Sequence, residues 1–397
     1  MGNRAYLDYA ATAPMLPQAR AAWLEQAGRL GNASSLHASG RATRRVVEES
    51  RESIAAAIGV RPSAVVFTSG GTEADNLAVK GLFWSRRDAM GGTRILASSI
   101  EHHAVLDPVE WLSRHQGADV RWLGVDAVGR VLLDEILDEL ARPADVALCT
   151  VMFANNEIGT VQPVADIAAL CRDAGVPFHT DAVQALGQLP LDLPAVGADA
   201  VTISSHKVGG PFGVGALIVD PRARLTPVLH GGGQEREVRS GTLDAPAIAG
   251  FAVAVTYAVD RQRDRAEHLI RLRERLVRGV LAGVPGAILN GDPGAGADQR
   301  LPGNAHFSFP GCEGDLLLML LDAAGIDCST GSACTAGIPE PSHVLLAMGV
   351  DESLARASLR FSLGEGSTEA DVDVVVAELP AAVDSARRAG TLASQVG

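Results

Sequence analysis

The chain has 397 residues, 47% of them hydrophobic, and a formal net charge of −13. That length and hydrophobic content are enough for two folded domains and exclude global disorder. The acidic balance disfavours nucleic acid as a partner, and the sequence lacks an apolar run of the ~18 residues that a membrane span needs. Because the N-terminus carries no secretion signal, we expect a cytoplasmic protein that does not contact membranes.

Short β-type runs alternate with helical patterns from about residue 60 to residue 220. Helical patterns such as 72–83 and 163–174 separate the β-type runs, which are 64–67, 94–97, 146–151, 176–179 and 200–203. This alternation predicts an α/β fold with a mostly parallel sheet and crossover helices. Residues 213–220 form a further candidate strand after a glycine turn, with an antiparallel direction as one option.

The pattern changes after residue 260. Residues 261–283 are rich in Arg, Glu and Leu and predict a long helix that leads into a smaller α+β domain. That domain contains a strand near 306–309, a helix at 313–324 and a strand near 358–362. We predict a large domain over 15–260 and a small domain made of 1–14 and 261–397.

Only two of the 34 basic residues are lysines, Lys80 and Lys207. Arginine stays protonated, whereas a lysine amine can lose its proton and form a Schiff base with a carbonyl. Lys207 follows a predicted strand, in the run Ser204-Ser-His-Lys, and a glycine-rich loop comes after it. This context alone leaves two interpretations open: a surface lysine in a turn, or the anchor of pyridoxal phosphate (PLP).

The residues that follow the predicted strands favour the second interpretation. Ligands of an open parallel sheet bind beyond the carboxyl ends of its strands. In strand order, these ends carry Gly70-Gly71-Thr72, Glu101-His102-His103, Asn155-Asn156, Asp181 with Gln184, and Ser204 to Lys207. A glycine-rich turn into a helix can hold a phosphate. PLP also needs a Schiff-base lysine, a carboxylate for its ring nitrogen and donors for its ring oxygen.

Five cysteines, without a C-x-x-C pair, argue against a disulfide framework or a thiolate metal site. Cys149 and Cys171 lie in apolar stretches and are expected in the core. Cys334 lies among small residues between Gly331 and Gly337, which predicts an exposed loop. Loop composition alone leaves a structural and a reactive thiol equally open.

Matching stretches along almost the whole chain resemble the cysteine desulfurases of the NifS/IscS type, within the class V aminotransferase-like PLP enzymes. The stretches are Tyr6-Leu-Asp-Tyr-Ala-Ala-Thr, Gly31-Asn-Ala-Ser, Phe67-Thr-Ser-Gly-Gly-Thr-Glu-Ala-Asp-Asn, Glu101-His-His-Ala-Val-Leu, Asn155-Asn-Glu-Ile-Gly, Asp181-Ala-Val-Gln, Ser204-Ser-His-Lys, His230-Gly-Gly-Gly-Gln-Glu, Arg239-Ser-Gly-Thr, Thr330-Gly-Ser-Ala-Cys-Thr and Arg360-Phe-Ser-Leu-Gly. The resemblance implies fold type I of the PLP-dependent enzymes and removal of sulfur from L-cysteine, with L-alanine and an enzyme persulfide as products.

The resemblance also implies roles around the coenzyme ring. Lys207 matches the Schiff-base lysine, and Asp181 matches the partner of the pyridine nitrogen. Asn156 and Gln184 match contacts of the ring oxygen. His102 matches the residue that stacks on the ring and moves protons.

Further matches concern the phosphate of the coenzyme. Gly71, Thr72, Ser204 and His206 match residues that hold it within the same chain. Thr242 matches a residue that reaches it from a second subunit, which implies a homodimer with shared sites.

The remaining matches concern substrate and sulfur. Arg360 matches the arginine that grips the substrate carboxylate, and Asn32 is expected to assist it. Cys334 matches the thiol that takes up the sulfur, which then passes to an acceptor such as an iron–sulfur scaffold or to tRNA or cofactor thiolation. We expect no resident metal, and at most a transient iron–sulfur contact at Cys334.

Alternatives remain on the same fold: a class V aminotransferase, a selenocysteine lyase, or a sulfur-carrier or scaffold-binding protein without turnover. The chain departs from some members in ending at residue 397, before the C-terminal tail with which they contact a scaffold. This departure leaves docking through such a tail without support in the sequence.

Overall fold

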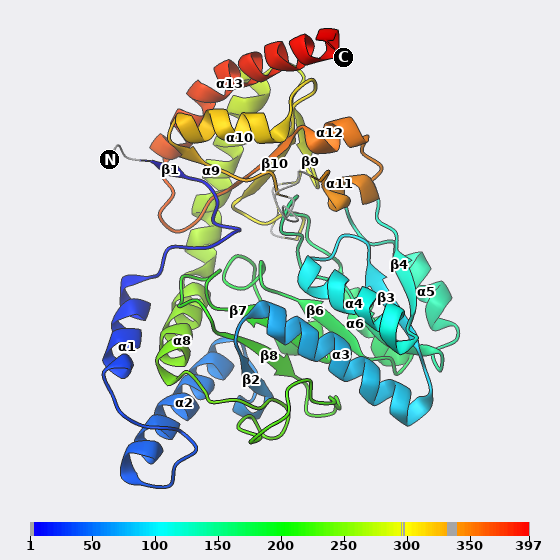
Figure 1. The fold of residues 1–397 in the computed structure, drawn as a ribbon, viewed down its shortest axis with the longest axis vertical. Helices are drawn as coiled ribbons and strands as arrows, with labels where there is room; N and C mark the ends of the chain where they lie inside the picture. The colour runs from blue at the N-terminus through cyan, green and yellow to red at the C-terminus, as the bar shows by residue number, and fades with distance from the viewer. Residues whose placement is uncertain (1–3, 295, 297, 332–339, 397) are drawn as a thin grey trace.

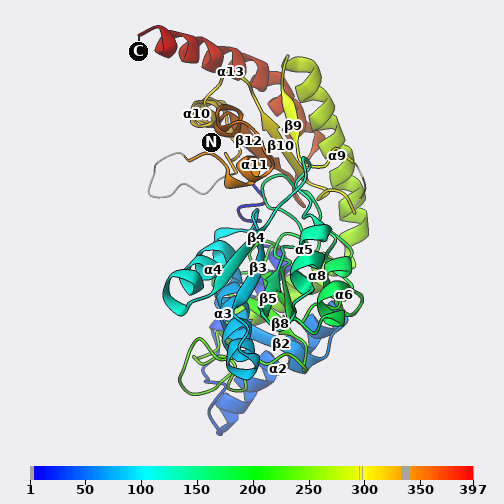
Figure 2. The same cartoon turned by 90° about the vertical axis from the view of Figure 1, so that its right-hand side faces the viewer.

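The computed structural model describes residues 4–294, 296, 298–331 and 340–396, which form a large and a small lobe (Figures 1 and 2). A seven-stranded sheet in the order β2-β8-β7-β6-β5-β3-β4 forms the centre of the large lobe. Its strands are β2 (Val65–Thr68), β3 (Arg94–Ser98), β4 (Asp119–Leu123), β5 (Val146–Thr150), β6 (Phe178–Asp181), β7 (Ala200–Ser204) and β8 (Gly215–Val219). Only β8 runs antiparallel to its neighbours β2 and β7, so the predicted parallel sheet and the antiparallel option for 213–220 are confirmed.

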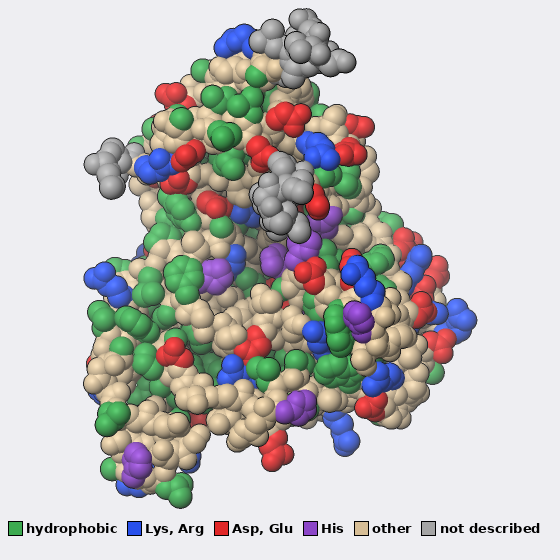
Figure 3. Space-filling model, in the orientation of Figure 1, with side chains coloured by type: hydrophobic (Ala, Val, Ile, Leu, Met, Phe, Trp, Pro, Cys, Tyr) green, Lys and Arg blue, Asp and Glu red, His purple; other side chains and the backbone are tan. Residues whose placement is uncertain are grey.

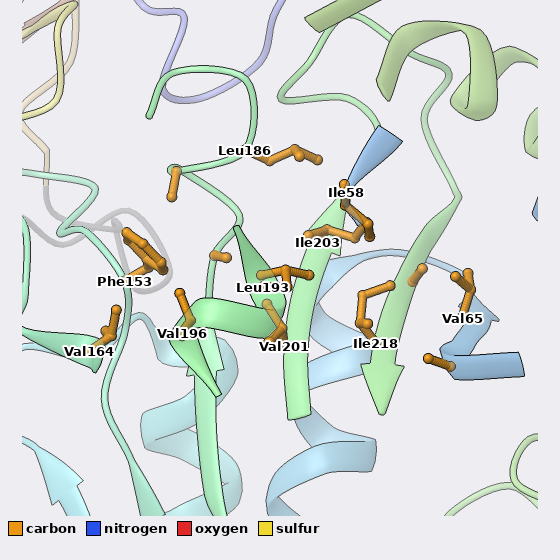
Figure 4. Close-up of a cluster of buried hydrophobic side chains, with 14 of the residues drawn as sticks. Ile58, Val65, Phe153, Val164, Leu186, Leu193, Val196, Val201, Ile203 and Ile218 are labelled. Atoms are coloured by element: carbon orange, nitrogen blue, oxygen red, sulfur yellow. The ribbon is translucent and has the colours of Figure 1, made fainter. Parts of the chain in front are cut away.

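Helices cover both faces of this sheet because alternate residues of each strand point to opposite sides. Val66 and Ile95 pack in one buried cluster with residues of α3 (Gly71–Met90) and α4 (His103–Gln116), whereas Val65 and Leu96 belong to a second cluster. Figure 4 shows part of this second cluster, with Val65 labelled. The helices of the large lobe are α1 (Pro17–Ala27), α2 (Ala38–Ala57), α3 (Gly71–Met90), α4 (His103–Gln116), α5 (Leu133–Leu140), α6 (Val164–Asp173), α7 (Leu193–Val196) and α8 (Ala245–Asp260), with a short 3-10 turn η1 (Pro62–Ala64).

The small lobe has its own sheet and core. Strands β9 (Ile288–Asn290), β10 (Asn304–Ser308) and β12 (Ser358–Ser362) pair antiparallel in the order β12-β10-β9, and β1 (Ala5–Tyr6) pairs parallel with β11 (Ile326–Asp327). The helices are α9 (Gln262–Gly283), α10 (Gly314–Ala323), α11 (His343–Ala347), α12 (Glu352–Arg356) and α13 (Glu369–Val396). The predicted helix at 261–283 and strand at 358–362 are therefore present.

A separate buried cluster holds the small lobe together. Leu7 from the N-terminal segment packs there with Leu272 of α9, Phe307 of β10 and Val375 of α13. The N-terminal segment therefore begins in the small lobe and crosses to α1 in the large lobe (Figure 1). The domain boundaries 1–14, 15–260 and 261–397 stay a prediction, with which this division of the core agrees. Among the described helices, none combines the length and the apolar character that crossing a membrane requires.

Candidate active site

A cavity of about 410 Å³ lies between the lobes, at the carboxyl ends of the strands of the large sheet. Several histidines visible in the space-filling view gather where the lobes meet (Figure 3). The large lobe lines the cavity with Gly71, Thr72, Asp75, His102, His103, Ala104, Met152, Ala154, Asn156, Glu157, Asp181, Val183, Gln184, Ser204, His206 and Lys207, and the N-terminal segment and the small lobe line it with Ala10, Ala11, Ser329, Gly331, His343 and Arg360. The strand ends singled out in the sequence thus converge on one cavity.

Lys207 follows the last residue of β7 by three positions. Its Nζ donates hydrogen bonds to the carbonyl oxygens of Ala10 at 2.6 Å and Ala11 at 2.8 Å. Burial, followed by the positive charge of Arg360, lowers the pKa of Lys207 from 10.5 to about 8. A lower pKa raises the fraction of neutral amine near pH 7, and the neutral amine is the nucleophile in Schiff-base formation.

The sequence predicts a strand at 176–179 with Asp181 after it. In the structure Asp181 is instead the last residue of β6. Its Oδ1 accepts a hydrogen bond of 2.8 Å from the Val183 amide. Burial raises the pKa of Asp181 to about 6, and the charge of Lys207 opposes this rise. A cationic ring nitrogen beside this carboxylate would restore its ionised form, since an opposite charge lowers the pKa of an acid.

The turn between β2 and α3 provides an anion cradle. Gly70 has a φ of 153°, a backbone conformation that favours glycine, and Gly71 opens the 20-residue helix α3. A Cβ at Gly71 would stand 3.2 Å from Val183 Cγ2 and 3.5 Å from Ser204 Cβ. The free N–H groups of the helix N-terminus, together with the hydroxyls of Thr72 and Ser204, suit a phosphate.

Two histidines in the cavity are neutral at physiological pH. His102 caps α4, where its Nδ1 accepts a hydrogen bond of 3.1 Å from the Ala104 amide. Burial and then the charge of Lys207 lower its pKa to about 4, so the neutral ring carries its proton on Nε2. Burial likewise lowers the pKa of His206 to about 4, and this ring stacks on Phe212 at 5.6 Å.

Arg360 reaches the cavity from β12 in the small lobe. Its Nη2 donates to Asp8 Oδ1 at 2.8 Å, and its Nη1 donates to the Asn156 carbonyl oxygen at 3.1 Å. Its Nε is buried and has no hydrogen-bond partner among the described residues. The guanidinium therefore keeps a donor for an incoming carboxylate.

Two predicted site residues, Asn32 and Thr242, do not line this cavity. Asn32 is exposed in the connection between α1 and α2, at the end of the large lobe away from the small lobe (Figures 1 and 2). Its Oδ1 accepts from the Ser34 amide at 2.9 Å, so assistance to Arg360 within one chain has no support in this arrangement. Thr242 is exposed as well, and Cys334 lies outside the described residues.

Lys80, the second lysine, has a structural environment. Its Nζ donates to Asn76 Oδ1 at 2.8 Å and lies 4.8 Å from the centre of the Trp111 ring. These contacts agree with its interpretation as a surface or packing residue.

Other cavity residues had escaped the sequence reasoning. Asp75 is fully buried, and burial followed by the charge of Asp181 raises its pKa well above the usual range. His343 Nε2 donates a hydrogen bond of 2.9 Å to the Glu101 carbonyl oxygen, and the His343 ring contacts the His103 ring edge-on at 5.5 Å. Asp8 does not line the cavity itself but forms an ion pair with Arg360, which does. These two residues are 352 positions apart in the chain, and the fold brings them together. Asp8 and Asp75 had one sequence signal, their place inside matched stretches, whereas His343 lies in none of these stretches.

The donor set of this cavity fits PLP. A helix N-terminus with hydroxyls suits the phosphate, a buried carboxylate suits a cationic ring nitrogen, and an amine with a pKa of about 8 suits an aldehyde. No group of three or more metal-binding side chains occurs among the described residues.

Comparisons with known proteins agree with this chemistry. The aminotransferase class-V family matches residues 5–375. An IscS-like cysteine desulfurase of Mycobacterium tuberculosis is 55% identical over 391 residues, which cover 98% of this chain and 99% of that protein.

Solved structures are similar as well. A NifS-like protein aligns with a TM-score of 0.87 at 33% identity, covering 96% of this chain and 100% of the other. SspA, solved in complex with cysteine, aligns with a TM-score of 0.78 at 32% identity, covering 91% of this chain and 99% of the other. This chain belongs to the aminotransferase class-V family and, within it, to the cysteine desulfurases of the IscS/NifS type.

Proposed function

We propose that the protein uses PLP to remove sulfur from L-cysteine, releases L-alanine, and holds the sulfur as a persulfide on Cys334. One observation carries the proposal: the Lys207 amine, with a pKa of about 8, shares a single cavity with the Asp181 carboxylate and the Arg360 guanidinium. The cysteine desulfurases among its relatives support the same activity.

The coenzyme contacts follow from the lining of the cavity. Lys207 would bond to the aldehyde carbon and Asp181 would pair with the ring nitrogen, with His102 against the ring. The oxygen contacts would come from Asn156 and Gln184 at the ring and from Gly71, Thr72, Ser204 and His206 at the phosphate. When bound, PLP supplies an electron sink for the bonds that break at the substrate carbon atoms.

Arg360 selects a substrate with a carboxylate. A bidentate carboxylate would take Nε, which lacks a partner among the described residues, together with Nη2, which now contacts Asp8. When the substrate binds, its carboxylate would therefore replace the Asp8 carboxylate at Nη2, and both groups are negatively charged. This exchange keeps the guanidinium neutralised in both states.

The proton steps fall to Lys207 and His102. The neutral Lys207 amine takes the proton from the substrate Cα, which its lowered pKa permits at physiological pH. The neutral His102 ring, protonated at Nε2, supplies a proton to the carbon that loses sulfur.

The Cys334 thiolate attacks the substrate sulfur. An S–S bond forms as the Cβ–S bond breaks, and the electron pair of the broken bond remains with the substrate, which takes up protons and leaves as alanine. Gly331, three residues before Cys334, and His343, nine residues after it, both line the cavity. These two anchors support access of the intervening segment to the substrate.

Alanine and sulfide production from L-cysteine under a reducing thiol tests the proposal. Cys334→Ser should retain the bound coenzyme and lose sulfide release, because a hydroxyl cannot take up the sulfur. Cys328→Ala is the matched control: this thiol is buried, which raises its pKa to about 12, and its loss should leave turnover intact. Undiminished sulfide release by Cys334→Ser refutes the sulfur step, and accumulation of the pyridoxamine form would indicate an aminotransferase.

We further propose that the enzyme acts as a cytoplasmic homodimer in which Thr242 reaches the coenzyme phosphate of the partner. The exposed position of Thr242, outside the cavity of its own chain, supports this arrangement. The four described cysteines are all free, as expected in a reducing compartment. The sulfur acceptor would be a protein such as an iron–sulfur scaffold.

A further inference from the structure

A second cavity, of about 260 Å³, lies next to the active site and is lined by Val208 and Gly209, the two residues that follow Lys207. Two chain stretches separate it from the active site: the Ala13 amide donates to the His206 carbonyl at 3.0 Å, and the Leu16 amide donates to the Gly209 carbonyl at 2.8 Å. Val208 and Gly209 therefore line this second cavity, whereas Lys207 lines the first.

An unpaired cation projects into the second cavity. Arg265 of α9 lines it, and its Nε is buried without a hydrogen-bond partner. No ion pair or side-chain hydrogen bond of Arg265 is formed with any residue in the described part of the chain, and burial lowers its pKa. The side chain as a whole is half-buried, but its Nε donor is buried and unsatisfied, which is costly and points to a ligand that accepts a hydrogen bond there.

The cavity also holds an anion, Glu365, and two tyrosines, Tyr9 and Tyr257. Glu365 lines the cavity from the crossing between β12 and α13, and it accepts a hydrogen bond of 2.8 Å from the Tyr257 hydroxyl. This contact leaves Glu365 directed to Tyr257 instead of Arg265. One positive and one negative group in the same cavity favour a ligand that carries both charges over a phosphate, which Glu365 would repel.

The rest of the lining is mostly apolar, with Pro14, Met15, Leu16 and Val208 among its members. Its volume lies below the roughly 300–1,000 Å³ of sites for drug-sized ligands. The ligand is therefore small and has an apolar part.

We propose that this cavity binds an α-amino acid with an apolar side chain, its carboxylate on Arg265 and its ammonium group on Glu365. The bound molecule would also contact residues 13–17 and 208–209, the two chain stretches that separate this cavity from the active site. The site is separate from the one in which Arg360 takes the substrate.

The probe is N,N-dimethyl-L-leucine, measured by calorimetry on the holoenzyme. Its tertiary amine keeps a positive charge and forms no Schiff base with the coenzyme, so active-site chemistry does not contribute. N,N-dimethyl-leucinol, which has an alcohol in place of the carboxylate, is the control ligand that shows what the carboxylate contributes to binding. We expect the amino acid to bind wild type about tenfold or more tightly than the alcohol does, and this difference should vanish in Arg265→Gln.

Variants on the same elements complete the test. Glu365→Gln, at an exposed position, should weaken binding of the probe. Arg263→Gln, at an exposed arginine of α9, the helix that carries Arg265, should leave binding of the probe unchanged. Without ligand, Arg265→Gln should melt no lower than wild type, because it removes a half-buried charge that forms no ion pair with a described residue. Absence of binding to wild type, or equal binding to Arg265→Gln, overturns the proposal; neither result touches the desulfurase assignment.

Discussion

The two lysines of this chain permit a direct test of the lowered pKa of Lys207. Burial and Arg360 lower this pKa from 10.5 to about 8. The difference corresponds to about 300-fold more neutral amine at pH 7 than an exposed lysine carries. Its neutral fraction should therefore rise with pH, with a midpoint near pH 8.

Trace acetylation of the coenzyme-free protein, followed by mass spectrometry across pH, measures both amines at once. Lys80 serves as the internal reference, because burial lowers its pKa as well but it lacks a neighbouring arginine among the causes. Arg360→Gln removes a positive charge and should move the Lys207 midpoint to higher pH. Asp8→Asn removes a negative charge and should move it to lower pH. A Lys207 midpoint at or above that of Lys80, or shifts of the opposite sign, would refute the reasoning.

Three further predictions concern single side chains. Borohydride reduction of the holoenzyme followed by peptide mapping should find the pyridoxyl group on Lys207, and Lys207→Ala should carry none; a label on Lys80 would contradict the assignment. Arg360→Lys should raise the KM for L-cysteine about tenfold or more with a smaller change in kcat, because a lysine lacks the planar fork. Arg51→Ala should lower the free energy of unfolding by about 3–5 kcal/mol, measured by denaturant titration, because it leaves the buried Glu235 carboxylate without its 2.6 Å partner.

Much of the large lobe could be predicted because its strands are buried on both faces. The run of Val146 to Thr150, for example, is buried throughout and reads as an uninterrupted apolar segment. The edge strand β4 was missed because only Leu123 of its five residues is buried, so the run looks polar. The residues that follow each predicted strand then indicated the ligand-binding edge, because the carboxyl ends of parallel strands lie at the same edge of the sheet.

The remaining site residues depend on contacts between distant segments. Asp8 becomes a partner of Arg360 only because β1 and β12 belong to the same lobe. His343 reaches the cavity by its contact with the Glu101 carbonyl, 242 positions earlier in the chain. Local patterns do not encode such pairs. The role of Asn32 stays a prediction, because a matched motif fixes a residue type and does not say which subunit's site the residue serves.

The exposed position of Thr242 leads to a prediction about subunits. If Thr242 reaches the partner's coenzyme phosphate, Thr242→Ala should weaken coenzyme binding about tenfold or more, since a hydrogen bond to a charged group is worth about 1.5–3 kcal/mol. A hybrid of one Lys207→Ala subunit and one Thr242→Ala subunit separates the two arrangements. Contact between subunits gives one site with both Lys207 and Thr242, which should bind the coenzyme as tightly as wild type. Contact within a subunit leaves every site that holds Lys207 without Thr242, so weak binding at that site would contradict a shared phosphate pocket.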